Sequence, residues 1–169
     1  GWNVRVSSSP VRPVDWETLN PAFKGATFVN DDDTCKTCHE DSMAKYAGTP
    51  HAQALAIPDN APQGKCESCH GPRSGHVESP DGTLAIADAR KQSAVCQQCH
   101  EGGPRMAWKA GAHLSGDVSC TSCHVVMDRK SPKALLAGSS VAATCDTCHA
   151  DVKADLNKMS HHPVREGSM

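Results

Sequence analysis

Cys35-Lys36-Thr37-Cys38-His39 is the first of five pentapeptides of the form C-x-x-C-H in this chain of 169 residues. The other four are Cys66-Glu67-Ser68-Cys69-His70, Cys96-Gln97-Gln98-Cys99-His100, Cys120-Thr121-Ser122-Cys123-His124 and Cys145-Asp146-Thr147-Cys148-His149. Together they contain all 10 cysteines of the chain. C-x-x-C-H is the attachment signature of c-type haem. The five copies therefore predict that covalently attached haem groups fill the interior of this protein.

The spacing within each motif suits a single porphyrin. Residues i, i+3 and i+4 share one face of a helical turn. The two thiols can add to the two vinyl groups of one haem, and the imidazole can bind its iron. We therefore predict five covalently attached haems c. The attachment residues are Cys35, Cys38, Cys66, Cys69, Cys96, Cys99, Cys120, Cys123, Cys145 and Cys148, and the proximal iron ligands are His39, His70, His100, His124 and His149.

Three other interpretations of the cysteines compete with haem. A thioredoxin-type redox pair needs a β-α-β pattern, which no motif shows. A zinc site commonly combines two C-x-x-C pairs, so five pairs would leave one pair without a partner. A disulfide scaffold gives no reason for a histidine after every second cysteine. Covalent haem explains all five histidines.

The composition agrees with an interior supplied by porphyrins. Leu, Ile, Val and Phe number only 24 of 169 residues, a fraction typical of disorder, yet the formal net charge is only −2. With 17 basic and 19 acidic residues the chain does not resemble a nucleic-acid binder, and it contains no apolar run that could span a membrane. We expect a mostly α multihaem cytochrome c fold with extensive irregular loops, little or no sheet, and a haem stack as its core.

The organisation of the chain follows the motifs. Residues 1–33 contain no cysteine or histidine and read as an extended N-terminal arm with Pro and Ser, so we expect a pentahaem domain over 34–169. Short helices are predicted over 35–47, 51–57, 84–100 and 141–157.

Five further histidines could serve as distal iron ligands. His51, His76 and His113 are predicted distal ligands, and of the adjacent His161 and His162 we favour His162. If only one of that pair ligates, Met127, three residues after His124, is the candidate for the fifth iron. A thioether ligand would raise the potential of that haem.

Three segments outside the motifs carry a family resemblance. They are Cys66–His76, Arg105-Met106-Ala107-Trp108 with Gly111 and His113, and Lys153–Pro163. They resemble the second haem segment, the third-to-fourth haem linker and the segment after the fifth haem of MtrA/DmsE-type decahaem cytochromes. The similarity covers about residues 34–169, which corresponds to the amino-terminal pentahaem half. The chain departs from the family in having no sixth motif and in carrying Met127 where relatives often have His.

The resemblance implies a periplasmic electron-transfer wire, part of which is inserted in an outer-membrane β-barrel porin. Implied partners are periplasmic cytochromes or quinol-linked donors, the porin, and an extracellular multihaem cytochrome. The pentahaem electron donor of periplasmic nitrite reductase is related. The chain begins at Gly1-Trp2 without a leader, so we expect export by a signal peptide absent from this chain.

The sequence leaves several functions open. The leading hypothesis is a non-catalytic wire within a porin–cytochrome conduit. The alternatives are a soluble donor to a periplasmic reductase, a subunit of a polymeric cytochrome filament, and a multihaem reductase of nitrite or hydroxylamine. The reductase needs an open sixth iron position, and the supply of spare ligands leaves no haem obviously open.

Overall fold

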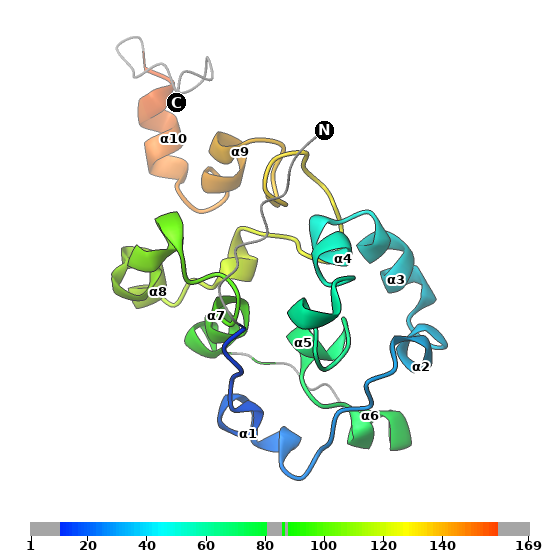
Figure 1. Cartoon of the computed structure of the whole chain (residues 1–169). Coiled ribbons are helices and arrows are strands. Elements are labelled where there is room, and N and C mark those ends of the chain that lie inside the picture. Colours follow the sequence, from blue (N-terminus) through cyan, green and yellow to red (C-terminus); the bar gives the residue numbers. More distant parts are fainter. Residues whose placement is uncertain (1–10, 81–85, 87, 159–169) are drawn as a thin grey trace.

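Short helices joined by long loops make up the computed structural model, which describes residues 11–80, 86 and 88–158 (Figure 1). The α-helices are α1 (Trp16–Leu19), α2 (Asp32–Lys36), α3 (Glu40–Ala47), α4 (Pro50–Ala54), α5 (Glu67–His70), α6 (Ser74–Glu78), α7 (Ala89–Gln97), α8 (Ala112–Ser115), α9 (Val141–Cys145) and α10 (Ala150–Leu156). The 3-10 helices are η1 (Pro21–Phe23), η2 (Pro58–Asn60), η3 (Gly103–Ala110) and η4 (Cys120–Ser122). β structure within these ranges is limited to one isolated bridge between His124 and Leu136. The predicted fold class, mostly helical and irregular, is confirmed.

The haem motifs interrupt helices that the sequence predicted as continuous. The segment 35–47 divides into α2 and α3, and the segment 141–157 divides into α9 and α10. At each break the motif histidine leaves the helical conformation, with φ/ψ of −113°/37° at His39 and −105°/61° at His149. Each of these histidines is then the N-cap of the next helix. A motif therefore ends one helix and orients the start of another.

The other two predicted helices are shorter than expected. α4 ends at Ala54, three residues before the predicted end, and it begins where the Thr49 hydroxyl accepts a hydrogen bond from the Ala52 N–H at 3.2 Å. α7 covers Ala89–Gln97 of the predicted 84–100, and residues 81–85 and 87 lie outside the described part. No helix among the described residues has both the length and the apolar character needed to cross a membrane.

Side chains alone form only a thin apolar core. Most of the packing between elements joins chain neighbours, such as α1 with η1, α3 with α4 and η3 with α8. The contact between α7 and η4 is the exception among these, because the two helices are separated in the sequence. Among the residues that the structure describes, the buried apolar side chains are Leu19, Phe23, Tyr46, Ala89, Leu114, Leu135 and Leu136. They lie in separate segments along the chain, as expected where another group fills the interior.

The N-terminal segment packs on the motifs. Over residues 11–33, expected to be extended, the structure has α1 and η1, and Phe23 is only 1% exposed. The Arg73 guanidinium stacks over the Phe23 ring at 5.3 Å, and the Arg12 N–H donates to the Gln98 carbonyl at 3.0 Å. The segment therefore contacts both the second and the third motif regions. The division of the chain at residue 34 stays a prediction.

Gly71, directly after the second motif, is packed against Trp16 of α1. Its φ is +78°, a left-handed conformation that favours glycine, and a Cβ at this position would lie 2.6 Å from Trp16 Cε3. The close approach brings the N-terminal segment against the end of the motif.

We predict that Gly71→Ala lowers the stability of the haem-loaded protein by about 1–3 kcal/mol, because the new methyl group meets both the ring and an unfavourable φ. Thermal unfolding followed by haem absorbance measures the effect. Gly75→Ala is the matched control, since its Cβ would meet nothing within 4 Å. Equal melting temperatures for the two variants would contradict this packing.

Candidate haem-attachment sites

All five motifs fold into the same hydrogen-bonded turn. In each, the carbonyl of the first cysteine accepts the N–H of the second cysteine at 3.1–3.4 Å and the N–H of the histidine at 2.9–3.1 Å. This turn brings the two sulfurs and the imidazole to one side of the backbone, as attachment to one porphyrin requires. All ten cysteines are free of disulfides. The local geometry therefore fits covalent haem at every motif.

Successive motifs approach one another through their cysteine side chains. Burial and, as the next contributor, the nearby Cys99 sulfur together raise the pKa of Cys69 to about 11. Burial likewise raises the pKa of Cys96, with Cys120 as the next contributor. The approaching pairs, in chain order, are Cys35 with Cys66, Cys69 with Cys99, Cys96 with Cys120, and Cys123 with Cys145. The attachment points thus form an unbroken series from the first motif to the fifth.

Three motif histidines are paired with the three histidines predicted as distal ligands. The ring centroids are 6.2 Å apart in His39–His76, 5.9 Å in His51–His100 and 6.1 Å in His113–His149. Two imidazoles on opposite sides of one metal ion, each bound through a nitrogen at about 2 Å, have centroids about 6 Å apart. The three separations fit an iron between each pair.

Burial favours the neutral, metal-binding form of two imidazoles, those of His51 and His70. Burial lowers the pKa of His51, and the nearby His124 lowers it further. Burial also lowers the pKa of His70, with Arg73 and His39 adding to the effect. The Nδ1 atoms of His51 and His76 are buried and have no hydrogen-bond partner in the described part of the chain. Such enclosed, unpartnered atoms fit a site that is completed by a bound group.

A loop with unusual backbone angles orients His124 of the fourth motif. Ala134 and Leu135 both have left-handed backbone, with φ of 51° and 55°. The Ala134 carbonyl lies 2.8 Å from His124 Nδ1, and the Leu135 carbonyl accepts from the Val125 N–H at 2.8 Å. A hydrogen bond at Nδ1 leaves Nε2 free for a metal and fixes the ring orientation. The loop with left-handed backbone at Ala134 and Leu135 therefore fixes the orientation of the His124 ring.

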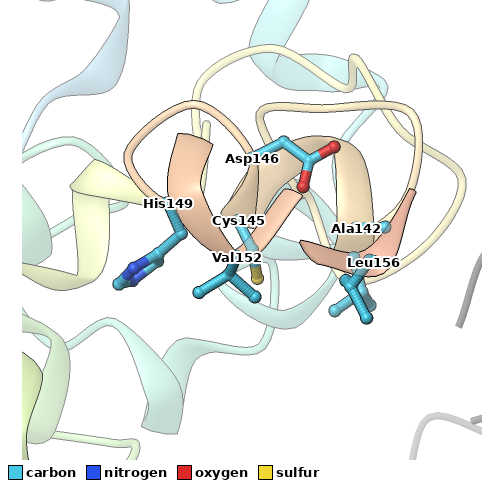
Figure 2. Close-up of a pocket in the computed structure, with 7 residues that line it drawn as sticks. Ala142, Cys145, Asp146, His149, Val152 and Leu156 are labelled. Atoms are coloured by element: carbon cyan, nitrogen blue, oxygen red, sulfur yellow. The ribbon is translucent and has the colours of Figure 1, made fainter. Parts of the chain in front are cut away.

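An apolar cavity of about 360 Å³ lies beside the fifth motif. Figure 2 shows Cys145, Val152 and Leu156 pointing to one side, while the Asp146 carboxylate points away. Val141 and Val152, which line this cavity, are 37% and 48% exposed. A flat apolar porphyrin attached at Cys145 would cover them.

The structure leaves some predicted ligands unassigned. Among the described residues, neither His70 nor His124 has an imidazole at the separation found in the three pairs. Met127 is half-buried in the loop after His124. His161 and His162 lie outside the described residues.

Sequence reasoning missed three groups that support the motifs: the Ala134 carbonyl, Asp32 and Glu67. Hydrogen bonds from the Cys66 and Lys65 N–H groups lower the pKa of Asp32, although burial opposes them. Glu67 and Asp146 both lie between the two cysteines of a motif, so this position alone does not identify a supporting carboxylate.

Comparison with known proteins agrees with this geometry. The doubled CXXCH motif family matches residues 59–104 and 113–154, which contain four of the five motifs. The chain belongs to this family. It is a multihaem c-type cytochrome that binds haem c through its C-x-x-C-H motifs, and the relationship implies electron transfer.

The cytochrome is also similar to the multiheme cytochrome MtrA of Shewanella baltica (strain OS185). The two are 33% identical over 178 aligned positions, covering 99% of this chain and 51% of that protein. The chain therefore spans about half the length of this curated relative. The resemblance seen in the linkers is confirmed, and it extends over the whole chain.

Proposed function

We propose that this cytochrome is an electron-transfer wire with five covalently attached haems c, one at each motif. The observation that carries the proposal is the unbroken series of motif neighbours, in which the cysteines of each motif approach those of the next. Because each porphyrin is bonded to these cysteines, neighbouring attachment points keep neighbouring haems close. Electrons then have a continuous path from one end of the series to the other.

The imidazole pairs support an assignment of axial ligands. His76 is the distal ligand of the His39 haem, His51 of the His100 haem, and His113 of the His149 haem. The irons of His70 and His124 take their distal ligands from Met127, His161 and His162. We favour His162 for one of these two irons.

The assignment favours electron transfer over catalysis. A haem that reduces nitrite or hydroxylamine needs an open or displaceable sixth position. In the proposed assignment both imidazoles of each pair would bind one iron, which would leave no open position at these three irons. We therefore propose that the cytochrome is not an enzyme.

The linker resemblance supports a place in a porin–cytochrome conduit. We propose that the cytochrome is periplasmic and enters an outer-membrane β-barrel porin. Its redox partners are periplasmic cytochromes or quinol-linked proteins on one side and an extracellular multihaem cytochrome on the other. The similarity to MtrA along the whole chain supports this arrangement.

The haem number is tested by mass and by pyridine haemochrome assay of the mature protein, for which we expect five haems per chain. Replacing Cys145 and Cys148 by Ser should remove one haem. Asp146→Asn in the same motif is the control and should keep five, because that carboxylate points away from the cavity (Figure 2). A wild-type count below five would refute the proposal.

The ligand assignment is tested by His51→Met. The imidazole planes of His51 and His100 are 87° apart, whereas those of His39 and His76 are 24° apart. Perpendicular and parallel axial imidazoles split the iron d orbitals differently, so we expect two types of low-spin EPR signal. His51→Met should weaken the near-perpendicular type, leaving the contribution of His113 and His149, whose planes are 65° apart, and it should raise one midpoint potential. His76→Met, the control, should remove the near-parallel type instead. An unchanged spectrum in His51→Met would exclude this pairing.

The conduit is tested by isolating the tagged cytochrome from outer membranes in mild detergent. We expect a stable complex with one β-barrel protein, and we expect the complex in liposomes to pass electrons from an enclosed reductant to external ferric iron. Recovery of the cytochrome as a free monomer that reduces a periplasmic reductase would favour the soluble donor, and recovery as polymers would favour the filament.

A further inference from the structure

Glu67, between the two cysteines of the second motif, is a buried carboxylate held by backbone N–H groups. It is 2% exposed. Oε1 accepts from the Val29 N–H at 3.0 Å and the Arg73 N–H at 2.9 Å, and Oε2 accepts from the Asn30 N–H at 2.7 Å. Three N–H groups around two oxygens suit an ionised carboxylate, which only accepts. The second motif thereby holds the segment that leads into the first.

Asp32, in the helix of the first motif, makes the reverse connection. Its Oδ1 accepts from the Cys66 N–H at 3.0 Å, and its Oδ2 accepts from the Lys65 N–H at 3.3 Å. Both donors lie at the start of the second motif. Each motif region therefore supplies one carboxylate to the backbone of the other.

The backbone is shaped to make this exchange. Asn30 has a left-handed φ of 55°, and its N–H and that of Val29 both donate to Glu67. Gly64 has φ of +82°, and a Cβ there would lie 3.5 Å from Asp32 Oδ1. The two turns place their N–H groups within reach of both carboxylates.

The exchange is located where the first two attachment sites meet. Asp32 is three residues before Cys35, and Glu67 follows Cys66 directly. The Cys35 and Cys66 sulfurs are adjacent, and each affects the pKa of the other after burial has raised both. A small shift of one motif would change the separation of the two porphyrins bonded to these sulfurs.

We propose that Asp32 and Glu67 form a reciprocal carboxylate clamp that fixes the first two haems relative to each other and lowers their potentials. The proposal rests on the five-haem function above. The hydrogen bonds set the relative position of the two motifs. The enclosed negative charge stabilises ferric iron, which carries more positive charge than ferrous iron. Both residues are positioning residues, because neither is an iron ligand.

The test uses the haem-loaded variants Glu67→Gln and Asp32→Asn and the double variant. An amide at either position replaces one acceptor by a donor that faces N–H groups. Circular dichroism in the Soret region reports the relative orientation of neighbouring haems, and an optical redox titration reports their potentials. We expect each variant to keep five haems, change the Soret couplet and raise one or more midpoint potentials. The effects in the double variant should be non-additive, because both carboxylates act on one interface.

Asp31→Asn is the matched control. Asp31 is exposed and directly precedes Asp32, so this variant removes the same charge from a neighbouring position. An Asn at position 31 can still cap α2. It should leave the Soret couplet unchanged. Wild-type spectra and potentials in both clamp variants, or an equal change in Asp31→Asn, would overturn the proposal. If Glu67→Gln does not accumulate, the result for Asp32→Asn decides the test. The side-chain oxygen that remains in Asp32→Asn can still accept the Cys66 N–H, so we expect this variant to fold. Failure of the five-haem function appears in the wild-type haem count, whereas failure of the clamp appears only in the variants.

Discussion

Each motif depends on one carbonyl that accepts two N–H groups. The first cysteine of every motif makes this pair of hydrogen bonds, and the resulting turn places two sulfurs and an imidazole on one side. Cysteine spacing alone would allow many conformations of a short segment. The turn selects the one in which a single porphyrin can be bonded twice and ligated once. Because the turn ends at the histidine, it also sets where α3 and α10 begin.

The arrangement around the motifs follows from this constraint. Buried apolar side chains are few and scattered, and most element packing is between chain neighbours. Polar and aromatic groups join distant segments of the described chain. Examples are the hydrogen bonds of the Asp32 and Glu67 carboxylates and the contacts between facing imidazoles. These groups surround the cysteines, where burial of a flat apolar cofactor would supply the missing core.

The sequence predicted the features that depend on local spacing. The haem motifs, the mostly helical class and the scarcity of apolar core all follow from residues a few positions apart. It did not predict the helix breaks at His39 and His149, because helix periodicity contains no information about where a ligand turns out of the helix. Nor did it predict that the His51 ring faces His100, from a motif 49 positions further along the chain. Such pairs, like the packing of Phe23 under Arg73, depend on tertiary approach.

The facing imidazoles also have a consequence for the unfolded chain. In the proposed assignment each iron ties two segments that are 36 to 49 residues apart, so three coordinate bonds act as cross-links. For covalent cross-links, closing loops of this length removes roughly 4 kcal/mol of denatured-state entropy each. Unlike thioethers, these bonds are reversible and break when a histidine takes up a proton. Acid would therefore release the loops while every porphyrin stays attached.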